Sequence, residues 1–229
     1  MKPLINILEK SEGALRKLKK GLQRKSDKQF GTLEQWFRDD PHGLRRSDFP
    51  HLTEDSVVFD LGGYEGQWTS DLYARYGCHV YVFEPVSEYA SLIRKRFKNN
   101  DKIHVFDFGL APSDADVTIE INEFASSFVN TRKGGGNSEL IHLRSFSAFL
   151  DENSITKIDL MKINIEGAEF ELLEHMMANG LFPLVEAFLI QFHDFVNGAT
   201  TRVARIEEAL SKTHHSLFNY PFVWSCWKQ

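Results

Sequence analysis

The fold is decided by residues 57–66, which read VVFDLGGYEG. The pattern predicts a buried strand that ends in an acid, Asp60, and is followed by a glycine-rich turn and a helix. Because glycine has no side chain, Gly62, Gly63 and Gly66 would let a ligand approach the backbone closely. The stretch therefore predicts one half of a ligand-binding edge in an α/β sheet.

A second apolar strand ends in an acid 18 residues after Gly66. Residues 80–85 read VYVFEP and place Phe83 and Glu84 at the end of that strand. An acid at this spacing is placed to hydrogen-bond the two hydroxyl groups of a ribose. The two stretches together predict the front half of a nucleoside-binding site.

The charge of the glycine turn indicates which nucleoside fits. A dinucleotide brings a pyrophosphate, which prefers bare N–H groups at a helix N-terminus. Here Asp60 precedes the glycines and Glu65 lies among them, and two carboxylates would repel a pyrophosphate. They suit S-adenosylmethionine, whose amino group and sulfonium are positive. The alternatives are a nicotinamide cofactor, or acids that only cap the turn and the helix.

The rest of the chain alternates strands and helices from Ser56 onward. Strands are expected near 57–60, 79–83, 103–107, 158–163 and 185–191, and helices near 66–76, 86–98, 145–152, 167–178 and 200–213. This alternation predicts a mostly parallel sheet with helices on both faces. Residues 117–121 are expected to add one strand after the third. Residues 216–227 are expected to close the sheet as one or two antiparallel edge strands.

A third motif lies at residues 157–169, which read KIDLMKINIEGAE. It resembles the signature of the FkbM-type methyltransferases, and the resemblance covers roughly residues 56–196. The Asp-Leu-Gly-Gly turn, the Phe-Glu-Pro strand end, the serine pair at 126–127 and the segment LRSF at 143–146 fit the same family. One departure is Asn164, where the family usually has aspartate, because asparagine can act neither as a base nor as an anion.

The resemblance implies a class I methyltransferase Rossmann-like fold with a seven-stranded-type sheet. It implies S-adenosyl-L-methionine as cofactor and transfer of a methyl group to a carbohydrate or polyketide-type hydroxyl. A sugar hydroxyl of a surface polysaccharide or related glycan is the expected acceptor, and nitrogen acceptors remain open. A non-catalytic module of a glycan-assembly complex is the alternative that Asn164 keeps open. No nucleic-acid partner is expected, since the net charge is −5.

The remaining candidates lie at the ends of later strands. Asp107 would accept from the adenine amine with Phe108 stacked nearby, or would only form a turn. Glu166 shares a helix face with Glu169 and is expected near the transferred methyl, beside Asn164. His193 would be a general base toward the acceptor hydroxyl, or a hydrogen-bonded strand cap. No spacing in the sequence requires a metal.

Length and composition suit one domain with an extension. The resemblance implies a methyltransferase domain at residues 56–229, behind an extension and cap at residues 1–55. Residues 1–28 alternate leucines with lysines and arginines, which predicts an amphipathic helix. That helix would dock on a membrane surface or a glycosyltransferase, or pack on its own domain. The two cysteines, Cys78 and Cys226, offer no disulfide framework, so a cytoplasmic location is expected.

Overall fold

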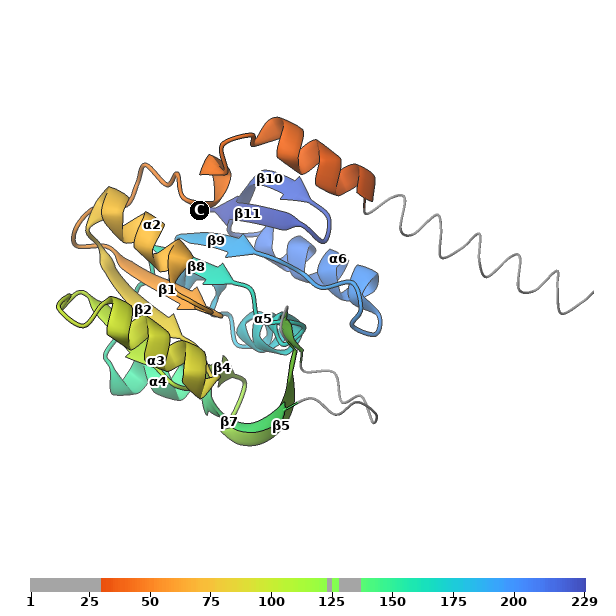
Figure 1. Cartoon of the computed structure of the whole chain (residues 1–229). Helices are drawn as coiled ribbons and strands as arrows, with labels where there is room; N and C mark the ends of the chain where they lie inside the picture. The colour runs from red at the N-terminus through yellow and green to blue at the C-terminus, as the bar shows by residue number, and fades with distance from the viewer. Residues whose placement is uncertain (1–29, 123–124, 128–136) are drawn as a thin grey trace, which may run out of the picture. The chain divides into compact units, whose positions relative to one another are not determined.

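The computed structural model describes residues 30–122, 125–127 and 137–229 (Figure 1). The chain forms two compact units, residues 1–43 and residues 44–229. The first unit contributes a helix over residues 30–39, whereas the amphipathic arm expected at 1–28 lies outside the described residues. That residues 1–55 form an extension and cap stays a prediction. Within the described ranges, no helix is both long enough and apolar enough to span a bilayer.

The second unit is built on a seven-stranded sheet with the order β10-β11-β9-β8-β1-β2-β3 (Figure 1). Its strands are β1 (Val57–Leu61), β2 (His79–Phe83), β3 (Ile103–Phe106), β8 (Leu160–Ile163), β9 (Ala187–Ile190), β10 (His215–Tyr220) and β11 (Trp224–Lys228). The pairs β3–β2, β2–β1, β1–β8 and β8–β9 are parallel, and β11 is antiparallel to β9. This confirms the predicted Rossmann-like fold of class I methyltransferases.

The C-terminal hairpin closes the sheet with two antiparallel strands, as expected, but only β10 lies at the edge. The last strand, β11, inserts between β9 and β10 and pairs with both, so it lies inside the sheet rather than at its edge. Its residues are buried except for Lys228, which is half-buried, and this explains the two tryptophans, Trp224 and Trp227, in such a short segment. The edge strand is β10, which runs parallel to β9 because both are antiparallel to β11.

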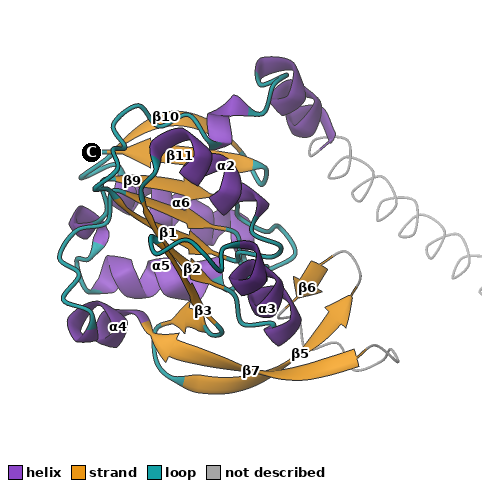
Figure 2. Cartoon of the chain, turned by 60° about the vertical axis from the view of Figure 1, so that its left-hand side comes forward, coloured by secondary structure: helices purple, strands orange, loops and turns teal. Residues whose placement is uncertain are grey.

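Helices cover both faces of this sheet (Figure 2). One face carries α2 (Gln67–Tyr76) and α3 (Ser87–Arg96), and the other carries α4 (Phe146–Glu152), α5 (Glu169–Ala178) and α6 (Ala199–Leu210). Two short 3₁₀ turns, η1 (Leu44–Arg46) and η2 (Phe182–Leu184), complete the unit. Side chains alternate along β1, so Phe59 and Leu61 join the core with α4, α5 and α6, while Asp60 faces Thr69 of α2. The parity of that strand matters for the site described below.

A second sheet follows β3, where the sequence had predicted a single strand. It has the order β4-β7-β5-β6 and consists of β4 (Gly109–Ala111), β5 (Ala115–Asn122), β6 (Ala125–Ser127) and β7 (Asn137–Ser145). It packs on the start of α3 through Val86, Ile119 and Ile141. The backbone N–H and the hydroxyl of Ser87 also donate to Glu139 of β7, at 2.9 and 2.6 Å. This sheet therefore forms a wall beside the carboxyl ends of β2 and β3.

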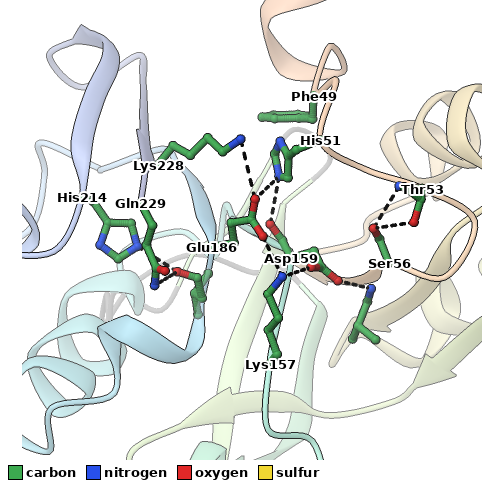
Figure 3. Close-up of polar contacts among 12 residues, drawn as sticks. Phe49, His51, Thr53, Ser56, Lys157, Asp159, Glu186, His214, Lys228 and Gln229 are labelled. Atoms are coloured by element: carbon green, nitrogen blue, oxygen red, sulfur yellow. Dashed lines mark hydrogen bonds and ion pairs between the residues drawn. The ribbon is translucent and has the colours of Figure 1, made fainter.

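An ionic cluster lies at the amino ends of the parallel strands (Figure 3). The carboxylate of Glu186, just before β9, lies 2.7 Å from Lys157, 3.6 Å from Lys228 and 4.0 Å from His51. Asp159 accepts from the backbone N–H of Val57 at 2.8 Å and also pairs with Lys157. The cluster thus ties the segment that enters β1 and the last strand to the starts of β8 and β9.

We expect Glu186→Gln to lower the free energy of unfolding at pH 7 by about 1 kcal/mol or less, because the pairs are partly exposed. The hydrogen bond from Lys157 holds the pKa of Glu186 below its usual range. A depressed pKa stabilises the fold above the unfolded value, and this contribution is lost as the pH falls through the folded value. Urea titrations should therefore show that the difference from wild type disappears below about pH 4. Glu208→Gln, at an exposed position on α6, is the control. If Glu186→Gln lost the same free energy of unfolding at pH 7 and below pH 4, the assignment would be contradicted.

Candidate cofactor-binding and active site

A cleft of about 720 Å³ lies at the carboxyl ends of β1, β2 and β8. It lies where open parallel sheets bind their ligands. The second sheet supplies a further wall through β4, β5 and β7, and the start of α5 supplies another. Among the predicted site residues, the described lining includes Gly62, Phe83, Glu84, Asn164 and Glu166.

Gly62 of the glycine turn lies against the backbone that follows β8. Its φ is 82°, and its backbone N–H donates to the carbonyl of Phe83 at 2.9 Å. A Cβ added at this position would lie 2.0 Å from the backbone oxygen of Asn164. Only glycine fits here, because the backbone of β8 presses on one side while the cleft opens on the other.

The other turn residues have structural roles. Gly63 packs against Val82 and Ile93, and Gly66 has a φ of 76° at the start of α2. Glu65 is exposed and its carbonyl accepts from Arg96. None of these three turn residues belongs to the described lining of the cleft, so Glu65 does not supply the charge that the sequence argument gave it.

Asp60 also lies outside the described cleft lining. Its side chain is fully buried, accepts from the Thr69 hydroxyl at 2.6 Å and forms an ion pair with Lys162 at 2.8 Å. The Lys162 ammonium donates further to the carbonyl of Gly62 at 2.7 Å. Lys162 was not among the predicted site residues; it meets Asp60 because the two are register partners in the parallel strands β8 and β1. The pair therefore supports the turn from the side that faces α2, and neither residue is among the described residues that line the cleft.

Glu84 lies at the carboxyl end of β2 with its carboxylate at the cleft. One oxygen accepts from the backbone N–H of Tyr64 at 2.8 Å, and the other accepts from Val86 at 3.0 Å. Burial raises the pKa of Glu84 to about 7, although both hydrogen bonds oppose the rise. Each carboxylate oxygen has a further lone pair, so a diol at this point could donate to both.

The EGAE segment connects β8 to the end of β9 through Glu169. This buried carboxylate accepts from the backbone N–H groups of Gly167 and His193, at 2.8 and 2.9 Å, and contacts the His193 ring at 3.1 Å. Glu166 has a φ of 51° and lies 3.6 Å from the other ring nitrogen of His193. The imidazole is thus held between two carboxylates.

His193 is itself outside the described cleft lining. Burial alone would lower its pKa, but the hydrogen bonds with Glu166 and Glu169 outweigh burial and raise the pKa to about 9. A ring that is protonated near neutral pH cannot accept a proton, so this geometry disfavours the base role expected for His193. The ring instead positions Glu166, which does line the cleft.

The expected adenine contacts are not where the sequence placed them. Asp107 is exposed and pairs with Arg94 at 3.2 Å. Phe108 packs against the rings of Phe83, Phe106 and Phe149. The chain passes directly from these residues into β4, and it is Gly109–Ala111 that line the cleft at this point.

The arrangement fits the positively charged nucleoside cofactor that the motifs imply. Glu84 offers a carboxylate at one end of the cleft, and Gly62 leaves the backbone open beside it. Asn164 lines the same cleft, and no donor among the described residues reaches its side-chain oxygen. Among the residues that the structure describes, no group of three His, Cys, Asp or Glu side chains is arranged to hold a metal ion.

We expect Gly62→Ala to cost about 1–3 kcal/mol more in the free energy of unfolding than Gly77→Ala. Both glycines have a positive φ, but a Cβ at Gly77 would meet nothing within 4 Å. The matched pair therefore separates the backbone strain, which is common to both, from the collision with Asn164. Chemical unfolding of the two variants measures the difference, and equal costs would show that the turn can move away from β8.

Comparison with known proteins agrees with this geometry. The profile of the methyltransferase FkbM domain matches residues 60–215. No curated protein sequence gives a significant match. The similar solved structures include an rRNA methylase from Streptococcus thermophilus, at 12% identity and a TM-score of 0.47, with 78% of this chain and 89% of that chain covered. They also include a fibrillarin pre-rRNA processing protein from Methanococcus jannaschii, at 10% identity and a TM-score of 0.46, with 79% and 69% covered.

Structural likeness at this level carries no argument about substrate. The profile match is different, because it spans more than half of the chain and includes the glycine turn, the end of β2 and the EGAE segment. It also decides against the nicotinamide alternative. The protein belongs to the FkbM family of methyltransferases.

Proposed function

We propose that the protein transfers a methyl group from S-adenosylmethionine to a hydroxyl oxygen. The preferred acceptor is a sugar hydroxyl of a surface polysaccharide or a related glycan, and this part rests on the family resemblance. The observation that carries the proposal is one cleft lined by Glu84 after β2 and by Asn164 and Glu166 after β8, on either side of β1. In this proposal residues 56–229 form the catalytic domain, and residues 1–28 mediate any contact with a membrane or a glycosyltransferase.

The cofactor supplies a methyl carbon that its sulfonium has already activated. The protein must therefore bind the cofactor and the acceptor, align the acceptor oxygen with the methyl carbon, and remove one proton from the acceptor. Glu84 is assigned to the ribose hydroxyls, because its two oxygens accept from backbone N–H groups and can each accept once more. Phe83 and Gly62 shape the adjoining wall.

Glu166 is assigned to the acceptor proton. Its carboxylate lines the cleft, and the His193 imidazolium holds it from the side away from the cleft lining. Asn164 is assigned as a hydrogen-bond acceptor that orients a ligand, because its side-chain oxygen meets no donor among the described residues. A non-catalytic module would have no use for the imidazolium that holds Glu166.

Affinity for S-adenosylhomocysteine should fall about tenfold between pH 8 and pH 6, because Glu84 with a pKa of about 7 is ionised at the higher pH and protonated at the lower. Glu84→Gln should bind weakly at both pH values. Calorimetric titration measures this, and Glu88→Gln, at an exposed site on α3, should behave as wild type. A pH dependence that survives in Glu84→Gln would remove the ribose assignment.

Turnover should fall about 10²–10⁴-fold in Glu166→Gln, because the amide cannot take the acceptor proton. Affinity for S-adenosylhomocysteine should change little. The assay follows tritium from labelled S-adenosylmethionine into neutral mono- and oligosaccharides. Cofactor binding without transfer to any hydroxyl or amine acceptor would support the non-catalytic alternative. Unimpaired transfer by Glu166→Gln would leave alignment alone as the catalytic device.

A further inference from the structure

Two cations beside the cleft, Arg202 and His193, each contact two carboxylates. Arg202 of α6 donates to Glu174 at 2.7 and 2.8 Å and to Glu171 at 3.1 Å. His193 lies between Glu166 and Glu169. With the His193 ring protonated, its two carboxylates keep one net negative charge. Glu171 shares Arg202 with Glu174, and Glu174 also feels the charge of Arg205. Since Glu166 and Glu171 line the cleft, their carboxylates face a ligand.

The third acid of the cleft lining is Glu84, and no described lining residue is basic. The cations that lie near the strand ends are held by carboxylates elsewhere. Lys162 pairs with Asp60 behind the turn. Arg94 pairs with Asp107 at 3.2 Å, and Arg144 pairs with Glu152 at 2.9 Å.

The wall that faces these acids is apolar. It is made by Val86, Leu110, Ile119 and Leu143, which come from the start of α3 and from the second sheet. Phosphate and carboxylate ligands need a charged fork or clustered N–H donors. An anionic group on an acceptor that came beside Glu166 and Glu171 would lose its hydration shell and meet like charge.

We propose that the cleft selects against anions, so that the acceptor is uncharged or cationic where it is methylated, and that phosphorylated sugars, nucleotide-linked sugars and nucleic acid are rejected. The assignment of an acceptor rests on the proposed function. The selection by charge is a property of the cleft and can be measured without an acceptor.

The test uses three nucleosides that differ in charge at the 5′ position, namely 5′-amino-5′-deoxyadenosine, adenosine and 5′-AMP. Each is titrated into the full-length protein by calorimetry, in parallel with S-adenosylhomocysteine. The amine should bind most tightly, and 5′-AMP should bind at least about tenfold more weakly than adenosine at low salt. The differences in affinity among the three nucleosides should become smaller at high salt, because screening weakens charge interactions.

Glu166→Gln and Glu171→Gln should each improve the affinity for 5′-AMP relative to adenosine by about threefold or more. Glu208→Gln is the control, because it removes the same charge from an exposed position on α6, outside the described cleft lining. It should leave the ratio unchanged.

The outcomes separate the two proposals. Tight binding of S-adenosylhomocysteine with 5′-AMP equal to adenosine would overturn the charge selection and leave the methyl-transfer proposal standing. If the three nucleosides followed the predicted order of affinity but S-adenosylhomocysteine did not bind, the methyl-transfer proposal would be overturned and the charge selection would stand. Binding of none of the four ligands would overturn both, and tritium transfer to a phosphorylated sugar but not to its parent sugar would also overturn the charge selection.

Discussion

The architecture of the cleft depends on the buried ion pair between Lys162 and Asp60. The two residues are directly paired across the parallel strands β8 and β1, and they are 5% and 0% exposed. Burying two charges is costly, and their attraction offsets that cost only when the remaining polar atoms are also satisfied. Here Thr69 donates to the second Asp60 oxygen, and Lys162 donates to the carbonyl of Gly62. Trp68 lies over the same ammonium, 5.8 Å from its ring centre.

The glycine turn is fixed from two sides, by this ion pair and by the end of β2. The Gly62 carbonyl is held by Lys162, and the Gly62 N–H is held by the carbonyl of Phe83 at the end of β2. The next residue but one, Tyr64, then presents its N–H to Glu84. The salt bridge, which lies outside the described cleft lining, therefore helps to place the Glu84 carboxylate. Loss of one partner would leave a buried charge unpaired, at a cost of about 3–5 kcal/mol.

The parity of the strands explains how much of the site could be predicted. Sequence reasoning placed the strands of the parallel sheet correctly, and Gly62 and Glu84 do line the cleft. It also placed Asp60 there, because strand ends in such sheets carry ligand-binding residues. However, β1 continues for one residue to Leu61, so that Asp60 points into the sheet–helix interface. A rule that names the strand end to within one residue cannot decide which face a side chain takes.

The second sheet explains why Asp107 and Phe108 do not lie where the sequence predicted them. Asp107 and Phe108 were expected at the adenine because β3 seemed to end in a loop. The chain instead enters β4, which pairs with β7, more than 30 residues later in the chain. Such long-range pairing leaves little trace in the local pattern of GLA at 109–111, which holds no alternation long enough to indicate a strand. The carboxylate Asp107 therefore turns to Arg94 on α3.

Asn164 is consistent with the charge balance of the cleft. Two carboxylates, Glu166 and Glu169, already share the single imidazolium of His193. An aspartate at position 164 would add a third carboxylate to that group, and Lys162, the nearest cation along β8, is already committed to Asp60. Asparagine keeps an oxygen at this point of the cleft without adding charge. The residue that departs from the family pattern therefore limits repulsion among carboxylates that the fold requires for other reasons, and it keeps an acceptor for a ligand's N–H or O–H group.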